Sequence, residues 1–376
     1  MIELGFVHAG AELYGSDRVL LDLVAGLDPA RFRARVVLPE QGPLVARLRQ
    51  AGAEVRFASV LGIRRAERAR PLRWLRGAAP ALQELDAALR GVELVHSTTL
   101  AVTGGALWAR RRGVPHLWQV QEIPPRAAAR ALGPLVAATS QAVSCASAAA
   151  RAALVRGWAG LRERVEVIHP GVRVPEPVPG LREAERARLG LGEEDLVLSL
   201  VGRVSPRKGA LLALEALERS ELARAQLWIV GGPAPGHAGY LARLRARVAR
   251  SPRWGAVRML GFRDDVAPIH AASDVLLVPS LLDEGFGLVA AEALAARRPV
   301  LATDRGGLAE VVRHEQSGLL LPPDARVWAI ALRRLARDEA LRERWGERGR
   351  QDMAERFSQA RALRAHTALY ERLARS

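Results

Sequence analysis

The sequence predicts an α/β protein of two doubly wound, Rossmann-like domains that face each other across a cleft. Short apolar runs alternate with amphipathic stretches, and the alternation restarts after a Pro/Gly-rich segment at residues 173–180. The chain of 376 residues is long enough for two cores. Strands separated by helices form parallel sheets with helices on both faces, and such folds bind ligands at the carboxyl ends of their strands.

The N-terminal half contains short apolar runs, which predict strands buried within a sheet. Stretches with helical spacing lie between them, such as Asp17–Gly26 and Pro43–Ala51. The predicted strands, in order, are Leu4–Val7, Arg35–Leu38, Val92–Val95, His116–Val120, Val143–Cys145 and Val165–Ile168.

The densest run of Pro and Gly, residues 173–180, predicts the linker. We expect an N-terminal domain over 1–174, a linker over 175–181, a C-terminal domain over 182–355, and a last helix over 356–376 that packs back on the N-terminal domain. After the linker, the sequence predicts a helix over Ala210–Leu217 and strands over Leu196–Val201, Leu227–Val230, Val257–Leu260, Val275–Val278 and Pro299–Ala302.

The composition excludes several classes of protein. The single cysteine, Cys145, excludes an internal disulfide and favours a cytoplasmic location. The N-terminus has no signal-peptide pattern, and the longest uncharged stretch, 131–150, contains Gly, Pro, Gln and Ser and predicts no membrane span. The net charge of +16 comes without zinc-finger spacing or aromatic-interleaved basic motifs. It therefore favours nucleotides or an acidic membrane surface over nucleic acid.

Lys208 is the only lysine among the 56 Lys and Arg residues. In a chain so rich in arginine, its retention indicates a position that needs a compact, flexible ammonium group. Gly202 and Gly209 flank it, Arg203 adds a second cation, and an apolar helical pattern follows. Glycines and cations at a helix start predict an anion site, most simply for a pyrophosphate. The alternative is a surface lysine without a function.

Two glutamates lie eight positions apart after the predicted strand Val275–Val278. Glu284 lies in the loop, and Glu292 lies in the second turn of the helix that begins near Leu288, after the Gly-Phe-Gly turn at 285–287. Carboxylates accept hydrogen bonds from hydroxyl groups, so Glu292 suits a ribose diol and Glu284 a sugar hydroxyl. The alternative is an acidic residue that only stabilises the first turn of a helix.

These motifs resemble those of the family 4 glycosyltransferases of the GT-B fold. The resemblance covers essentially the whole chain and is most specific at Gly202-Arg203…Lys208-Gly209, Gly261–Val266, Glu284-Gly285-Phe286-Gly287…Glu292 and Asp304–Glu310. It implies a retaining transferase that takes a sugar from a nucleoside diphosphate sugar, of the UDP or GDP type, without a metal ion or another cofactor.

The resemblance also implies a role for each residue of the donor site. Arg203 and Lys208 bind the diphosphate, Glu292 binds the ribose, and Glu284 binds the donor sugar together with the amides of 285–287. The catalytic candidates are Arg203, Lys208 and Glu284. The implied donor-binding set is Gly15, Gly202, Arg203, Lys208, Glu284, Gly285, Phe286, Gly287, Leu288 and Glu292.

The N-terminal half resembles the same family, with one departure. Gly15 matches a glycine whose backbone approaches the donor phosphates and the acceptor, and Asp17 is an acceptor-side candidate. Where relatives commonly show a histidine followed by an acid, this chain has Gln121 and then Glu122. Glutamine cannot carry a proton at neutral pH, so the role of that histidine does not transfer to Gln121. Gln121 and Glu122 remain acceptor-side candidates.

The implied acceptor is a glycan or a lipid-linked molecule, in cell-envelope or polysaccharide biosynthesis. Residues 63–76 hold six arginines, one glutamate and Trp74, which predict either peripheral docking on the anionic inner face of a membrane or a solvated loop. The alternative function is a GT-B protein that binds nucleotide sugar with little transferase activity, or an epimerase-like enzyme.

Overall fold

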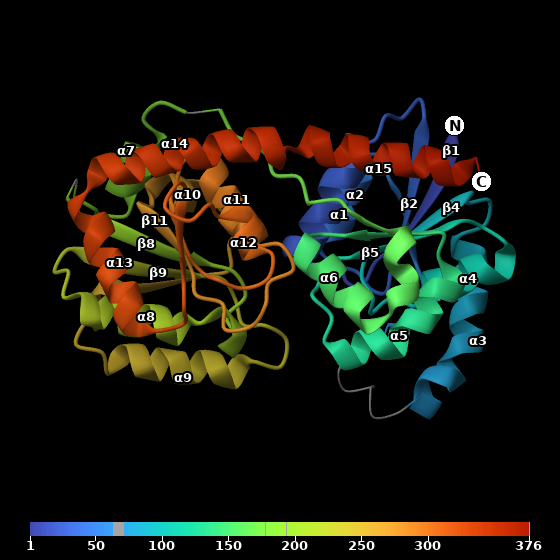
Figure 1. The fold of residues 1–376 in the computed structure, drawn as a ribbon, viewed down its shortest axis with the longest axis horizontal. Coiled ribbons are helices and arrows are strands. Elements are labelled where there is room, and N and C mark those ends of the chain that lie inside the picture. Colours follow the sequence, from blue (N-terminus) through green and yellow to red (C-terminus); the bar gives the residue numbers. More distant parts are fainter. Residues whose placement is uncertain (63–70, 177, 193, 376) are drawn as a thin grey trace. The chain divides into compact units, whose positions relative to one another are not determined.

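The computed structural model describes residues 1–62, 71–176, 178–192 and 194–375 of the chain (Figure 1). The chain divides into two compact units, each with its own parallel sheet. Unit 1 comprises Met1–Gly171 and Gln359–Ser376, and unit 2 comprises Val172–Ser358. The predicted fold class, two doubly wound parallel α/β domains, is confirmed.

The described part of unit 1 contains a parallel sheet with the strand order β3-β2-β1-β4-β5-β6-β7. The strands β4, β5 and β6 are buried at every residue, as is typical of a sheet covered on both faces. The strands are β1 (Ile2–Val7), β2 (Phe32–Leu38), β3 (Glu54–Phe57), β4 (Leu94–Ser97), β5 (His116–Val120), β6 (Ala142–Cys145) and β7 (Val165–Val167).

Helices cover both faces of this sheet because successive side chains of a strand point to opposite sides. Leu4 and Phe6 of β1 pack with α1, α2 and α15, whereas Val7 packs with α3 and α4. Figure 1 shows these two groups of helices on opposite sides of the strands. The helices are α1 (Gly15–Gly26), α2 (Pro43–Gln50), α3 (Pro71–Ala88), α4 (Gly104–Arg112), α5 (Arg126–Thr139), α6 (Ala148–Gly157), the 3-10 helix η1 (Ala159–Arg164) and α15 (Gln359–Ala374).

The sheet of unit 2 has the strand order β10-β9-β8-β11-β12-β13 among the residues described. Leu198 and Leu200 of β8 pack with α8, α9 and α13, whereas Val197 packs on the other face with Ile269 of α10. The strands are β8 (Leu196–Val201), β9 (Ala225–Val230), β10 (Val257–Gly261), β11 (Val275–Val278), β12 (Val300–Thr303) and β13 (Gly318–Leu321).

Two long helices of unit 2 begin at aspartate caps. The side chain of Asp324 accepts from the amide of Arg326 at 2.8 Å, and that of Asp338 accepts from the amide of Leu341 at 2.7 Å. The helices are α7 (Leu181–Arg188), η2 (Pro206–Lys208), α8 (Ala210–Ser220), α9 (Ala238–Ala249), η3 (Trp254–Ala256), α10 (Ala267–Ala272), α11 (Leu288–Ala295), α12 (Leu308–Val311), α13 (Ala325–Arg337) and α14 (Glu339–Arg356).

The structure differs from the sequence-based expectation mainly at strands. β3 and β13 were not predicted, and both lie at the edge of their sheets. In β3 only one of four residues is buried, so it carries no apolar run. β4 begins at Leu94 rather than at Val92, because the Val92 amide donates to the Leu89 carbonyl at 3.1 Å and closes a turn after α3.

Candidate functional site

The order of the strands reverses between β8 and β11 of unit 2. From β8 the sheet continues to β9 and β10, and from β11 it continues in the opposite direction to β12 and β13. Ligands of doubly wound sheets bind outside the carboxyl ends of two such neighbouring parallel strands. The loop 202–209 follows β8 and the loop 279–287 follows β11, so the two motifs found in the sequence lie at the same edge.

Backbone contacts join these two loops directly. Gly209 has a φ of +67° at the start of α8, and a Cβ there would lie 1.8 Å from the carbonyl oxygen of Pro279. The amide of Leu281 donates to the carbonyl of Arg207 at 2.7 Å. Gly209 is therefore required for the close approach of the two loops as well as for the positive φ.

Lys208 forms an ion pair across the two loops. Its Nζ donates to Oε1 of Glu284 at 2.7 Å, and the Oγ of Ser280 donates to the same oxygen at 2.5 Å. The side chains of Lys208 and Glu284 are 30% and 18% exposed, so both can meet a ligand. A Cβ on Gly202 would lie 3.9 Å from Cε of Lys208, which places the loop backbone beside the lysine side chain.

The charge of Glu284 depends on this pair. Burial alone would raise the pKa of Glu284, but the nearby charge and hydrogen bond of Lys208 outweigh it, with further help from Ser280 and Arg207, and the pKa lies below its ordinary value. Glu284 is therefore a carboxylate at neutral pH. A carboxylate only accepts hydrogen bonds and an ammonium only donates them, so this edge offers partners for hydroxyl groups and for an anion side by side.

The turn 285–287 leads into α11. Gly287 has a φ of +99° and caps the helix. A Cβ on Gly307 would lie 2.6 Å from both the carbonyl oxygen of Gly285 and the Cα of Phe286, so the turn is packed closely against the chain before α12. The first-turn amides of a helix are not used within it and favour an anion.

The other predicted donor residues lie around this turn. Phe286 is 4% exposed and packs on Phe357 with ring centroids 5.3 Å apart, so its side chain is part of the core. Glu292 is half-exposed on α11, and Leu288 is half-exposed at the start of that helix. Arg203 is half-buried in the loop after β8.

Unit 1 has its own switch point, between β1 and β4. His8 follows β1, and its Nδ1 lies 2.5 Å from Oγ1 of Thr98, which follows β4. The other ring nitrogen of His8 lies 2.7 Å from Oδ1 of Asp17, whose second oxygen accepts from the amide of Tyr14 at 2.9 Å. Asp17 is only 5% exposed. Both of its carboxylate oxygens are bound within unit 1, and these contacts hold the start of α1. Gly15, the first residue of α1, is exposed.

Gln121 and Glu122 follow β5, beside the loop after β4. Oε1 of Glu122 accepts from Oγ1 of Thr99 at 2.8 Å and from the amide of Leu100 at 3.0 Å. Burial raises the pKa of Glu122 in spite of these hydrogen bonds. Gln121 donates through Nε2 to Oε1 of Gln119 at 3.1 Å. The acceptor-side candidates of unit 1 thus lie at the carboxyl ends of β1 and β5. The carboxyl end of β4 lies between these two strand ends, because β4 is the strand between β1 and β5.

Sequence reasoning missed several residues of these two edges, namely Ser280, His8, Thr98 and Thr99. Each lies directly after a strand or within two residues of its end. Their position was therefore visible in the sequence, but hydroxyl and imidazole groups at strand ends are too common to be singled out without knowledge of their partners.

Part of the predicted basic segment 63–76 lies outside the described residues. Residues 63–70 are not described, and residues 71–76 form the start of α3 without described side chains. Among the residues that the structure covers, no group of His, Cys, Asp and Glu side chains could hold a metal ion. In that same part of the chain, no helix combines the length and apolar character needed to cross a membrane.

Two family models match the chain. The model described as glycosyl transferase 4-like domain matches residues 14–171, and the model described as glycosyl transferases group 1 matches residues 182–352. Similar curated proteins include the D-inositol 3-phosphate glycosyltransferase of Nocardioides sp., 38% identical over 224 residues, which are 56% of this chain and 48% of that protein. The enzyme of the same name from Rhodococcus opacus is 34% identical over 262 residues, or 66% of this chain and 55% of that protein. The chain thus spans about half the length of these relatives.

Solved structures share the fold. HepE of Anabaena in complex with UDP-glucose has a TM-score of 0.88 and 22% identity, and the match covers 99% of this chain and 100% of that one. The sucrose-phosphate synthase of Thermosynechococcus elongatus has a TM-score of 0.81 and 22% identity, with 100% of both chains covered. At these identities the likeness concerns the fold alone.

Proposed function

Because the chain belongs to the family 4 glycosyltransferases of the GT-B fold, we propose that it transfers a hexosyl group from a nucleoside diphosphate sugar to an acceptor hydroxyl with retention of configuration. The observation that carries this proposal is the Lys208–Glu284 pair at the switch point of unit 2. In this pair the ammonium group of Lys208, which can bind a diphosphate, lies beside the carboxylate of Glu284, which can accept a hydrogen bond from a sugar hydroxyl. The names of the similar curated proteins support glycosyl transfer, and the UDP-glucose complex of HepE supports a UDP sugar as the donor.

In this proposal unit 2 supplies every donor contact of the implied set except that of Gly15, which stays a prediction from the resemblance. Lys208 and Arg203 bind the diphosphate, with the backbone at Gly202 close to it. Glu292 accepts from the ribose hydroxyls, and Glu284 accepts from a hydroxyl of the donor sugar. The amides of Gly285, Phe286, Gly287 and Leu288 complete the site at the start of α11.

The chemistry proposed for these residues is electrostatic. The acceptor oxygen forms a bond to the anomeric carbon on the face from which the diphosphate departs, and the acceptor proton moves to the departing phosphate oxygen. Lys208 and Arg203 stabilise the negative charge that develops on the diphosphate, so no metal ion is required. No protein base takes part, which is why glutamine at position 121 is compatible with turnover.

The acceptor groups proposed in unit 1 have different tasks. Glu122 and Gln121 contact the acceptor, and Thr99 and Gln119 hold their side chains. Asp17 acts indirectly, because its oxygens are bound to His8 and to the amide of Tyr14. In this arrangement it positions the backbone at Gly15 instead of contacting the acceptor.

The test begins with the donor. Purified protein is screened by thermal unfolding against UDP, GDP and their sugars, since a ligand of the native state raises the melting temperature by mass action. With the donor found, Lys208→Ala and Arg203→Ala should each lower turnover by about a hundredfold or more, the usual loss when a transition-state charge partner is removed. Arg245→Ala, on the exposed face of α9, is the matched control. Unchanged turnover in both site variants would refute the proposal.

Product analysis without acceptor separates the proposed activity from the alternative. A transferase gives free nucleoside diphosphate and glycosylated acceptor only when the acceptor is present, apart from slow hydrolysis. An epimerase-like enzyme converts the nucleotide sugar itself in the absence of acceptor.

The acceptor class completes the proposal. We propose a glycan or lipid-linked acceptor of envelope polysaccharide synthesis, which the enzyme reaches by docking on an anionic membrane surface through the basic segment 63–76. The net charge of +16 supports this. Co-sedimentation with vesicles should require anionic lipid, fall with added salt, and weaken when Arg64, Arg65, Arg68 and Trp74 are replaced. Vesicle binding that does not depend on the charge of the lipid would contradict this docking and would indicate a soluble acceptor.

A further inference from the structure

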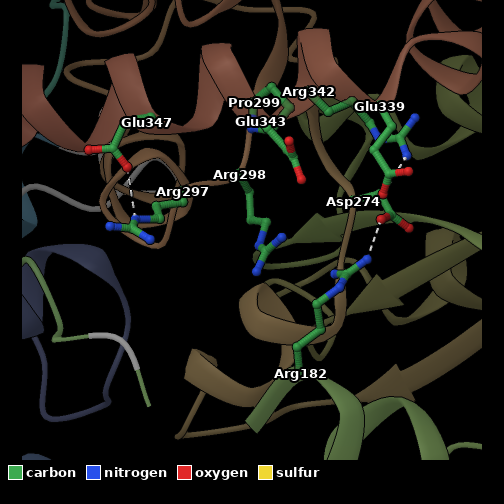
Figure 2. Close-up of a pocket in the computed structure, with 9 residues that line it drawn as sticks. All are labelled: Arg182, Asp274, Arg297, Arg298, Pro299, Glu339, Arg342, Glu343 and Glu347. Carbon is green, nitrogen blue, oxygen red and sulfur yellow. Dashed lines mark hydrogen bonds and ion pairs between the residues drawn. The ribbon is translucent and has the colours of Figure 1, made fainter. Parts of the chain in front are cut away.

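A pocket of about 370 Å³ lies at the amino ends of strands in the unit 2 sheet, opposite the ends that carry the donor loops. Asp274 and Pro299, which line it, directly precede β11 and β12, whereas the donor loops follow the carboxyl ends of β8 and β11. The remaining wall comes from Arg182 of α7, from Arg297 and Arg298 in the turn after α11, and from the first three turns of α14. Figure 2 shows that almost every side chain on this wall is charged.

Most of the charges in the pocket are already paired. Asp274 accepts from Arg182 at 2.5 Å and lies 3.3 Å from Arg186, which does not line the pocket. At the turn after α11, Nε of Arg297 lies 3.0 Å from Oε2 of Glu347. The carboxylates of Asp274 and Glu347 therefore already have cationic partners.

Arg298 differs from the other arginines of the wall. Its Nε is buried and has no hydrogen-bond partner among the residues that the structure describes. Figure 2 shows its side chain extending into the pocket, with Arg182 and Glu343 facing the same space. Burial lowers the pKa of Arg298 to about 10, and the nearby charges of Arg182, Arg186 and Arg297 add to this effect, which Asp274 opposes. The charge of Arg298 is partly removed from water, which is costly, and an anion at the pocket end of its guanidinium group relieves that cost.

We propose that this pocket binds a small oxyanion, a carboxylate or phosphate group, on the guanidinium of Arg298. The planar guanidinium matches the paired oxygens of such groups, and the pocket is large enough for a small metabolite that carries one. Arg182 faces the same space, but its charge is already paired with Asp274, so Arg298 carries the binding. Glu343 lines the pocket and is exposed, so its negative charge opposes the anion and limits the affinity.

The experiment measures thermal unfolding of the full chain in sodium phosphate, sodium malonate and sodium chloride at equal ionic strength. The variants are Arg298→Met, which removes the charge at similar volume, and the control Arg245→Met on α9. Phosphate or malonate should raise the melting temperature above that in chloride for the native protein and the control. In Arg298→Met the apparent Kd for that anion should rise at least about tenfold. Phosphate and malonate are separate arms, and the one that stabilises identifies the oxyanion.

Two further variants keep the result specific. Phosphate could also bind at the donor loops, so Lys208→Ala must retain the anion-dependent stabilisation if the pocket is its source. Glu343→Gln should lower the Kd for the anion, because a negative charge of the lining is removed. Without anion, Arg298→Met should unfold at the same or a higher temperature than the native protein, since an incompletely paired buried charge is lost. Equal stabilisation of Arg298→Met and native protein, or stabilisation no greater than in chloride, would overturn the proposal.

Discussion

Glu284 keeps its charge because Lys208 lies 2.7 Å away, against the effect of its own burial. The pair also keeps each side chain in place while leaving part of it exposed. A lysine suits this position because its single ammonium group can donate to Glu284 and still turn a hydrogen toward a phosphate. The glutamate on α11, Glu292, lies on a helix in which its neighbours Ala291 and Ala293 are buried.

The two glutamates should therefore respond differently to substitution. We expect Glu292→Ala to weaken the binding of free nucleoside diphosphate by about 1.5–3 kcal/mol, the range for a hydrogen bond to a charged group. Glu284→Ala should leave diphosphate affinity nearly unchanged and lower turnover of the nucleotide sugar. Calorimetric titration of the diphosphate together with steady-state kinetics makes the comparison. Equal losses of diphosphate affinity in both variants would contradict the assigned roles.

At the scale of elements, the donor edge depends on how closely the loops after β8 and β11 approach each other. Gly209 combines a positive φ with a position where a Cβ would meet backbone. Gly190, after α7, has the same φ of +67° but no atom within 4 Å of the place a Cβ would take. The two glycines thus separate the cost of backbone strain from the cost of moving a loop.

Alanine substitution of these glycines is a matched pair. Gly190→Ala should cost about 1–2 kcal/mol of unfolding free energy, the strain of a left-handed non-glycine residue. Gly209→Ala should cost more and should also weaken nucleotide binding, since the loop after β11 must move. Urea unfolding and nucleotide titration provide the two measurements. A Gly209→Ala variant with native nucleotide affinity would show that loop contact is not needed for binding.

At the scale of the whole molecule, unit 1 is completed by the last helix of the chain. Tyr370 of α15 is fully buried, and its hydroxyl lies 2.8 Å from Nδ1 of His96 on β4. His366, one turn earlier, lies 3.4 Å through Nε2 from Nε2 of Gln119 on β5. Unit 1 therefore has buried imidazoles in its core, which water cannot reach.

Unit 1 should be sensitive to acid for this reason. Burial lowers the pKa of His116 to about 3 and that of His366 to about 4, and it lowers the pKa of His96 as well, with help from neighbouring histidines. Because these pKa values lie below the ordinary 6.5 of an unfolded chain, the unfolded state takes up protons first as the pH falls. Stability is thus full above about pH 6.5 and decreases below it, by about 2 kcal/mol per histidine at pH 5.

Urea unfolding at pH 7.5 and pH 5.0 measures this loss. His366→Gln should show a smaller difference between the two pH values than the native protein, by about 2 kcal/mol. His314→Gln, at an exposed histidine, should behave like the native protein. An unchanged pH dependence in His366→Gln would mean that this imidazole is not the source of the acid sensitivity.

The sequence by itself determined the alternation of strands and helices, the two sheets, and the positions of the motifs after β8 and β11. These are local properties, because apolar runs, glycines and a solitary lysine are visible without knowledge of their neighbours. The edge strand β3 was not predicted because only one of its four residues is buried, so it carries no apolar run. The strand β13 was missed although its run Leu319–Leu321 is apolar and three of its four residues are buried.

Only the tertiary structure decided which side chains meet. Lys208 and Glu284 are 76 residues apart, and His8 and Thr98 are 90 apart. They meet because β8 lies next to β11 and β1 next to β4, and this strand order is set by the packing of helices on both faces of each sheet. The pocket around Arg298 depends on the same packing, since α7, the turn after α11 and α14 come together only in the folded unit.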